Sequence, residues 1–372
     1  MAKPLQHLKI LDLSRILAGP FATQLLADLG AEVLKIEPPK GDPTRGWGPP
    51  FEPGENGESA YFICANRGKR GIVLDFDEPQ SLVQLHELIK QADVLVENFL
   101  EVSAARLGLT WERLHEQYPK LIVASIRGFA SDVPAHHRAG YDFIIQAESG
   151  WMSVTGEPEG RPTKVGLPLV DVLTALYLAN GIQAALLHRE RSGEALHVEV
   201  PLMEAALAGL VNVGSSVLLT GRTPQRFGNA HPQIVPYQTF RCQDGEVALG
   251  VGSDAQFEML ALWLGLDLDQ EPGWRLNRGR VEDRERLIAV LEGLLLQRCR
   301  EDVLSFCETH AIAASLVRTV DDALFRQAGI LHHLIQTVYD QASGRMVPLL
   351  ASPILLNDER AFSKLPPPRR KL

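Results

Sequence analysis

The sequence predicts an α/β protein with a Rossmann-like large domain, built on a parallel sheet, and a smaller α+β domain. Up to about residue 200, short apolar strand patterns alternate with helical patterns, and such connections produce a mostly parallel sheet covered on both faces. Near residue 223 the pattern changes to two strands followed by several helices. The length of 372 residues also suits two domains of about 150 residues each.

The first half of the chain supplies the strands of the expected parallel sheet. Apolar segments of strand length are residues 8–13, 31–37, 71–76, 93–99, 121–126 and 196–200. Helical periodicity is found over residues 21–29, 78–91, 169–191 and 202–219. Two stretches rich in Gly and Pro, 41–57 and 153–168, are expected to be loops. Long loops inside a compact domain usually carry function.

The second half of the chain indicates the smaller α+β domain, over residues 223–330. Strand patterns there cover 235–240 and 247–251. Helical patterns follow over residues 256–264, 282–297 and 300–310. Two further strand patterns, 334–339 and 346–349, precede a proline-rich end.

The composition excludes several classes of protein. Hydrophobic residues make up 45% and charged residues 22%, as in ordinary folded proteins. The net charge of −9 argues against nonspecific attraction to nucleic acid or to anionic membranes. No apolar run reaches the length that spans a bilayer, and charged residues interrupt the N-terminal stretch, so we expect a cytoplasmic protein. The four cysteines form no C-x-x-C pair, so we expect neither a disulfide framework nor a metal site.

The motifs of several common enzyme classes are missing from the sequence. The turn from Ser14 to Pro20 follows the first expected strand and contains one glycine, whereas a turn that binds a dinucleotide pyrophosphate needs several. The chain contains no G-x-S-x-G elbow and no P-loop motif. The sequence therefore disfavours a dehydrogenase, a serine hydrolase and a nucleoside triphosphatase.

Asp171 is the strongest candidate for a catalytic side chain. It falls in the first turn of the long apolar helix expected over 169–191, where the helix dipole and free N–H groups favour a carboxylate. One interpretation is a capping aspartate. The other is a carboxylate nucleophile, which must be stripped of water and protected from hydrolysis. Gly250 and Gly252 could form a mobile cover or a simple turn.

Two further side chains have both a structural and a functional interpretation. Tyr141, in the segment Gly140-Tyr141-Asp142, could direct its hydroxyl into a pocket or satisfy it within the core. His231 lies in the turn Gly228-Asn229-Ala230-His231-Pro232 and could contact a ligand or cap the backbone.

Several motifs in order along the chain resemble those of one family. They are LDLSRILAGPFATQLLADLGAEVLKIEPPKGDPTRGWGPPF, ESAYFICANRGKRGIVLDF, ADVLVENF, RAGYDFIIQAESGWMSVTG, PTKVGLPLVD and GNAHPQIVPYQTFRCQDG. Together they resemble the class III CoA-transferases, the family that contains formyl-CoA transferase, carnitine CoA-transferase and α-methylacyl-CoA racemase. The likeness is strong over about residues 5–257 and looser to about residue 353.

The resemblance implies a domain arrangement and a chemical mechanism. It implies a large domain formed by residues 1–222 together with a returning C-terminal segment, 331–372. It also implies a homodimer of two subunits interlocked like rings. In the family, an aspartate at the position of Asp171 attacks an acyl-CoA thioester to give a mixed anhydride and then an aspartyl-CoA thioester. No metal or tightly bound cofactor is implied, and the CoA thioester is a substrate.

The family contains both transferases and racemases, and one position separates them. Racemases carry histidine in the motif Gly-His-Asp, as one of the groups that move a proton at the α-carbon. This chain has Gly140-Tyr141-Asp142, and tyrosine resembles the transferases. The alternatives are an α-methylacyl-CoA racemase or epimerase and a non-catalytic acyl-CoA-binding protein.

The resemblance also assigns substrate-binding roles. Arg106 matches an arginine that contacts the CoA phosphates, a task that suits a planar guanidinium. Trp47 and Tyr61 match aromatic residues near the acyl group.

Other positions depart from formyl-CoA transferase. That enzyme has glutamine, lysine and arginine where this chain has Leu17, Ala139 and Pro38. Leu17 offers no polar donor for a small anion, and Arg138 stands next to the missing lysine. Arg15 and His231 are candidates for binding a second carboxylate of the acceptor. The stretch 228–240 is similar to transferases that use succinyl-CoA and a dicarboxylic or branched acid.

Overall fold

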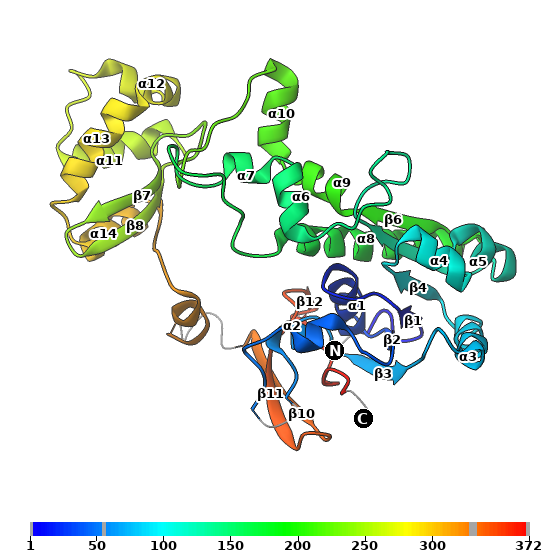
Figure 1. The fold of residues 1–372 in the computed structure, drawn as a ribbon. Helices are drawn as coiled ribbons and strands as arrows, with labels where there is room; N and C mark the ends of the chain where they lie inside the picture. The colour runs from blue at the N-terminus through cyan, green and yellow to red at the C-terminus, as the bar shows by residue number, and fades with distance from the viewer. Residues whose placement is uncertain (1–2, 54–56, 327–332, 370–372) are drawn as a thin grey trace. The chain divides into compact units, whose positions relative to one another are not determined.

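The structure is a computed structural model, and it describes residues 3–53, 57–326 and 333–369. The described chain forms two compact units (Figure 1). The larger unit comprises the described residues of Met1–Trp151, Lys164–Thr223 and Gly329–Leu372, and the smaller unit those of Met152–Thr163 and Pro224–Ala328. The segment 152–163, which the sequence analysis did not separate from the large domain, therefore belongs to the smaller unit.

The larger unit is built on a six-stranded parallel sheet, which confirms the predicted α/β fold. The strand order is β3-β2-β1-β4-β5-β6. The bounds are β1 Lys9–Asp12, β2 Glu32–Glu37, β3 Lys69–Val73, β4 Val94–Glu97, β5 Ile122–Arg127 and β6 His197–Pro201. From β1 the chain adds strands toward one edge of the sheet, and from β4 it adds them toward the other edge. Ligands of open α/β sheets bind beyond the carboxyl ends of the two strands where the direction changes.

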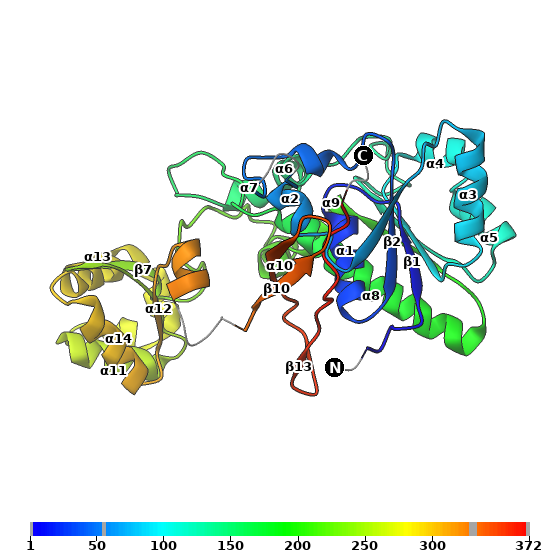
Figure 2. The same cartoon turned by 90° about the horizontal axis from the view of Figure 1, so that it is seen from below.

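Helices cover both faces of this sheet because neighbouring side chains of each strand point to opposite sides. Ile10 belongs to the core packed under α1 and α8, and Leu11 belongs to the core under α3, α4 and α5. Figure 2 shows these two groups of helices on opposite sides of the strands. The bounds are α1 Ala18–Asp28, α3 Pro79–Ile89, α4 Glu101–Leu107, α5 Trp111–Gln117 and α8 Leu169–Ser192.

Two predictions for this unit are wrong in detail. β3 begins at Lys69 and not at residue 71. An apolar pattern cannot include Lys69, because its side chain is charged, but in the fold this side chain is fully buried against Asp12 (Nζ to Oδ2, 2.9 Å). The single helix expected over 202–219 is two helices, α9 (Leu202–Ala208) and α10 (Val211–Thr220), bent by 77°. The bend follows Gly209, where a Cβ would lie 2.7 Å from the Trp151 ring.

The length of α8 also corrects the sequence analysis. With 24 residues, α8 is long and apolar enough to span a bilayer, and α9 with α10 would pass the same test as one broken span. Half of the apolar window of α8 is buried inside the structure, and its buried residues pack with those of α1 in one core. A core helix of a soluble protein has the same length and composition, so this feature is weak support for a membrane span.

The C-terminal segment packs against the larger unit. It forms two antiparallel hairpins, β10 (Ile335–Asp340) with β11 (Arg345–Leu350) and β12 (Leu355–Leu356) with β13 (Glu359–Arg360). The guanidinium of Arg67 donates to the Leu350 carbonyl at 2.7 Å. The Ser363 amide donates to Asp28 at 2.9 Å. These bonds join residues about 300 positions apart.

The smaller unit combines a three-stranded antiparallel sheet with helices. The strands, in the order β7-β8-β9, are Tyr237–Cys242, Gly245–Gly250 and Ala313–Leu316. Its longer helices are α11 Asp254–Leu264, α12 Asn277–Glu282, α13 Arg284–Leu295 and α14 Arg300–Thr309. Its core contains the buried apolar side chains of Phe240, Phe257 and Leu291.

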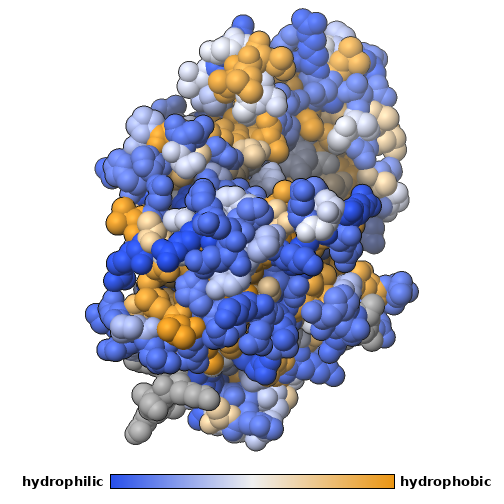
Figure 3. Space-filling view, turned by 90° about the vertical axis from the view of Figure 1, so that its right-hand side faces the viewer, coloured by the Kyte–Doolittle hydropathy of each residue, from blue (hydrophilic) through white to orange (hydrophobic). Residues whose placement is uncertain are grey.

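The remaining elements are short. They are the 3-10 helices Pro43–Gly46 and Pro272–Arg275, the helices α2 Ala60–Ile63, α6 Asp142–Glu148 and α7 Trp151–Val154, and the π-helix Asp322–Arg326. Figure 3 shows one face of the molecule, on which hydrophilic residues predominate and hydrophobic residues form separate patches.

Candidate functional site

A cavity of about 330 Å³ lies within the larger unit. Its walls come from the turn after β1, the residues after β4 and β5, the loop before α6, and the starts of α8 and α9. β1 and β4 are the pair from which the strand order runs in opposite directions, so the cavity occupies the usual ligand position of such a sheet. The predicted site residues that line it are Arg15, Leu17, Arg138, Tyr141 and Asp171.

Asp171 occupies the first turn of α8, as predicted, and a second carboxylate lies beside it. The N-cap residue of α8 is Pro168, whose side chain makes no capping hydrogen bond. Instead, Asp142 Oδ1 accepts the Val170 amide at 2.9 Å. Asp171 is 8% exposed. Burial, and then the charge of Asp142, raise the pKa of Asp171 to about 7. Asp171 is therefore a desolvated carboxyl that ionises near neutral pH.

A close approach of two loops places Tyr141 at the cavity. A Cβ on Gly140 would lie 2.6 Å from the Gly128 Cα, and a Cβ on Gly128 would lie 2.7 Å from the Gly140 nitrogen. Only glycine fits at both positions. Gly128 directly follows β5, so this contact fixes the Gly140-Tyr141-Asp142 segment against the end of the sheet. Tyr141 itself is 55% exposed and lines the cavity.

Trp47 and Tyr61 form an aromatic pair near Asp171. Their ring centroids are 5.1 Å apart in an edge-to-face arrangement. Burial, and then the negative charge of Asp171, raise the pKa of Tyr61 to about 12. The Tyr61 hydroxyl therefore stays protonated at neutral pH and can donate a hydrogen bond. Tyr61 lies in α2, whose N-cap Ser59 accepts the Phe62 amide at 3.0 Å.

The three arginines of the cavity differ in their partners. Arg138 makes a bidentate contact with Glu148 at 2.8 and 2.9 Å, and Arg127 pairs with buried Glu97 at 2.8 Å. Arg15 makes no ion pair with any residue that the structure describes, and its guanidinium lies 5.8 Å from the Phe99 ring centroid. Arg15 is therefore the cavity arginine with a charge left for an anionic ligand.

Six of the predicted site residues do not line this cavity. Two of them, Trp47 and Tyr61, form the aromatic pair described above. Arg106 is exposed on α4 and pairs with Asp77 at 2.9 Å. His231, Gly250 and Gly252 belong to the smaller unit. There, His231 Nδ1 accepts the Gln233 amide at 3.1 Å, which is the backbone-capping contact considered from the sequence.

Three residues were missed as site residues by sequence reasoning. Asn98 and Arg127 line the cavity, and Asp142 holds the start of α8. Their positions were the available signal, because Asn98 follows β4 and Arg127 ends β5. Polar residues at the carboxyl ends of parallel strands meet at one edge of the sheet.

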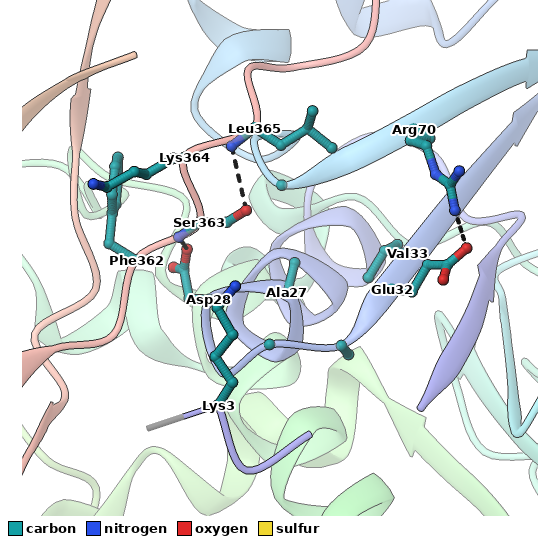
Figure 4. A pocket seen from close by; sticks show the side chains of 13 residues that line it. Lys3, Ala27, Asp28, Glu32, Val33, Arg70, Phe362, Ser363, Lys364 and Leu365 are labelled. Atoms are coloured by element: carbon teal, nitrogen blue, oxygen red, sulfur yellow. Dashed lines mark hydrogen bonds and ion pairs between the residues drawn. The ribbon is translucent and has the colours of Figure 1, made fainter. Parts of the chain in front are cut away.

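A second cavity of the larger unit carries less chemistry. It has a volume of about 470 Å³ and lies beside the C-terminal segment (Figure 4). Its carboxylates are already paired, Asp28 with Arg67 and Glu32 with Arg70. Among residues 3–53, 57–326 and 333–369, no cluster of three or more His, Cys, Asp or Glu side chains could hold a metal ion.

Comparisons with known proteins agree on one family. A sequence model described as CoA-transferase family III matches residues 5–370. The succinate–glutarate CoA-transferase of Agrobacterium fabrum is 38% identical, over 98% of this chain and 92% of that protein. The human succinyl-CoA:glutarate CoA-transferase is 38% identical, over 89% of this chain and 75% of that protein. A CAIB/BAIF family protein from Brucella suis has a solved structure with a TM-score of 0.86 and 38% identity, covering 99% of this chain and 96% of that one.

Proposed function

Because the chain belongs to CoA-transferase family III, we propose that it moves CoA from an acyl-CoA donor to a carboxylic acid through covalent intermediates on Asp171. The observation that carries this proposal is the environment of the Asp171 carboxyl. It is desolvated, has a pKa of about 7, and lines a cavity with an arginine available for an anion. A carboxylate attacks a thioester only when it is desolvated and aligned in this way.

The proposed cycle begins with donor activation. An ionised Asp171 oxygen attacks the thioester carbonyl, the C–S bond breaks, and the CoA thiolate leaves, which produces a mixed anhydride. The thiolate then attacks the Asp171 carbonyl carbon of that anhydride. The donor acid leaves as a carboxylate, and an aspartyl-CoA thioester remains.

The second half of the cycle reverses these steps with the acceptor. An acceptor carboxylate oxygen attacks the aspartyl thioester and releases the thiolate, which forms a second anhydride. The thiolate attacks the acceptor carbonyl, and the new acyl-CoA and free Asp171 result. The oxyanions that develop need donors, and the hydroxyls of Tyr61 and Tyr141 are our candidates for this role.

For the substrates, we propose succinyl-CoA as the donor and a dicarboxylic acid as the acceptor. The Agrobacterium and human relatives are named for succinate or succinyl-CoA and glutarate. Arg15 supports a second carboxylate, because no described residue neutralises its guanidinium in the cavity. Leu17 lines the same cavity as Arg15 and is 5% exposed. The cavity wall at Leu17 is therefore apolar and suits the methylene chain of a dicarboxylic acid.

Four further features are part of the proposal. We propose that Arg106 contacts CoA phosphates and that Gly250 and Gly252 cover the covalent intermediates. We also propose a cytoplasmic homodimer with interlocked subunits. Exposed apolar side chains on α10 support a partner surface, since Leu218 and Leu219 are 89% and 86% exposed and large exposed apolar areas usually mark interfaces.

The test is an exchange assay that follows new CoA esters by mass. The protein is mixed with succinyl-CoA and either glutarate or a monocarboxylate of equal length, and a second sample is quenched with hydroxylamine after acyl-CoA alone. We expect glutaryl-CoA in the first sample and a hydroxamate on Asp171 in the second. Deuterium at the α-carbon in heavy water without an acceptor would favour a racemase. Binding of CoA esters with no exchange would favour a non-catalytic binding protein.

A further inference from the structure

The turn that carries Arg15 contains a backbone conformation that its sequence does not favour. Ile16, next to Arg15, has a φ of 75°. A β-branched residue rarely adopts this left-handed region, because its Cβ crowds the backbone. Such a conformation persists only where the surroundings hold it in place.

Contacts on both sides of Ile16 hold the turn. The Asn98 amide group clamps the Arg15 peptide, because its Oδ1 accepts the Arg15 N–H at 3.0 Å and its Nδ2 donates to the Arg15 carbonyl at 2.8 Å. Lys35 Nζ donates to the Ser14 carbonyl at 2.9 Å. Asp42 Oδ1 accepts the Ile16 N–H at 3.4 Å.

Lys35 and Asp42 are also partners of each other. Their side chains are 0% exposed, and Lys35 Nζ lies 3.1 Å from Asp42 Oδ2. Asp42 in addition accepts the amide and the hydroxyl of Thr44 at 3.0 and 2.8 Å. These two bonds start the 3-10 helix Pro43–Gly46, and Trp47 is the residue that caps its C-terminal end. One buried pair therefore touches two segments that carry predicted site residues.

Other charges surround this pair, and one of them also reaches the turn. Glu37 accepts the Asp42 amide at 2.7 Å and pairs with Arg45. Lys69 on β3 pairs with Asp12 on β1. Asp12 Oδ1 also accepts the Ser14 amide at 3.0 Å. A buried ion pair adds little net stability over apolar residues of the same shape, so its distinctive contribution here is the geometry that it imposes on the turn.

We propose that the buried Lys35–Asp42 pair positions Arg15 for the acceptor. Lys35 and Asp42 are positioning residues, because they act on the turn backbone and the Arg15 side chain does the binding. This inference rests on the proposed function, in which Arg15 binds the second carboxylate of the acceptor.

The first experiment measures succinyl-CoA:glutarate exchange by Asp42→Asn, Lys35→Met and the control Asp28→Asn. Asp28 also forms a buried ion pair, with Arg67, but it lines the other cavity. We expect both variants of the pair to raise the KM for glutarate by about 10-fold or more, since small misplacements in a site are costly. We expect the rate of Asp171 acylation by butyryl-CoA, a donor without a second carboxylate, to change by less than about threefold, because Arg15 has no anion to bind in that step.

The control separates a positioning role from a structural one. Asp28→Asn should lower thermal stability and leave the KM for glutarate unchanged. Variants of the pair that lose stability but keep the wild-type KM would overturn the inference. If Asp42→Asn does not fold, Lys35→Met provides the same comparison from the other side of the pair.

A second arm tests the turn directly and does not depend on activity. The amide of Ile16 should exchange with deuterium at least about 10-fold faster in Asp42→Ala than in Asp28→Ala, because alanine offers no oxygen to accept that amide. Ile16→Gly relieves the left-handed strain, so it should restore part of the glutarate KM in the Asp42→Asn background. Unchanged exchange and no rescue would overturn the inference. Absence of any transfer by the wild type would instead overturn the proposed function and leave this exchange comparison valid.

Discussion

The two units differ in where they bury charge. In the larger unit, buried charged side chains gather beneath and around the candidate site, among them Asp12, Lys35, Asp42, Lys69, Glu97 and Asp171. Among the described residues of the smaller unit, Arg280 is the one buried charged side chain. It donates to the carbonyls of Val235, Trp274 and Arg275 and to Asp254.

This difference separates two uses of buried charge. Arg280 satisfies backbone carbonyls of the smaller unit, so its role is to hold that unit together. In the larger unit, the pairs hold the turns and helix starts that present reactive groups. Burial opposes the ionisation of Asp12, but nearby Lys69 and Lys35 lower its pKa to about 2. No cation lowers the pKa of Asp171, which burial and the charge of Asp142 raise to about 7. The larger unit thus contains paired charges around the candidate site, together with the Asp171 carboxyl, which we propose to be the reactive one.

The largest expected effect is on the reactive carboxyl. Asp171→Ala removes the proposed nucleophile, so we expect transfer to fall by about 10³-fold or more. The measurement is single-turnover formation of the new CoA ester, with Asp28→Asn as a matched loss of a buried carboxylate. Full transfer by Asp171→Ala would remove the proposed distinction between reactive and supporting carboxyls.

The next effect is on the stability of the smaller unit. Arg280→Met leaves three buried carbonyls without their donor, so we expect the free energy of unfolding to fall by about 3 kcal/mol. The measurement is urea unfolding followed by the fluorescence of Trp274, which is buried in that unit. The acylation rate of Asp171 per folded molecule should not change. A large loss of that rate would show that the charge of the smaller unit also serves the chemistry.

A smaller effect is expected at the acceptor end of the cavity. Arg15→Leu removes a charged hydrogen-bond donor, a loss of about 2 kcal/mol, so the KM for glutarate should rise about 30-fold. The KM for a monocarboxylate of equal length should change little. Arg138→Leu is the matched control, because Arg138 is already paired with Glu148. Equal effects on both acids would contradict a role in binding the second carboxylate.

The raised pKa of Asp171 also predicts a pH-dependent effect on stability. The folded state holds the Asp171 proton up to about pH 7, whereas the unfolded state releases it near pH 4. The stability that this proton supports is complete below about pH 4 and is lost as the pH rises through 7. Asp171→Asn should therefore be more stable than the wild type by about 1–2 kcal/mol at pH 8 and nearly equal at pH 4. A stabilisation that is the same at both pH values would contradict this origin.

The smallest expected effect concerns Asp142. Asp142→Asn removes the like charge that raises the pKa of Asp171 and keeps an oxygen to accept the Val170 amide. The pH midpoint of Asp171 acylation should shift downward by up to about one unit. The variant Asp142→Ala, which also removes the acceptor, should in addition lower the rate at high pH. An unchanged midpoint in Asp142→Asn would show that burial alone raises the pKa.

Local patterns were sufficient for most elements of the fold and for the position of Asp171 at the start of a helix. The periodicity predicted α8 over 169–191 and placed Asp171 in its first turn, and the structure has α8 over Leu169–Ser192. The residues that begin a helix, those that end it and its apolar repeat all lie within one segment of the sequence. The bend between α9 and α10 was missed, because it depends on the packing of Gly209 against Trp151. That contact joins residues 58 positions apart.

By itself, the sequence determined the α/β class, most strand and helix positions, and a carboxylate at the start of a long helix. Only the tertiary structure decided which residues surround that carboxylate. Asn98 clamps Arg15 across 83 positions and Asp42 reaches Ile16 across 26. The order of the strands brings these segments to one edge of the sheet. Contacts of this kind leave no periodic signal, because each depends on a pairing of distant segments that burial and strand order select together.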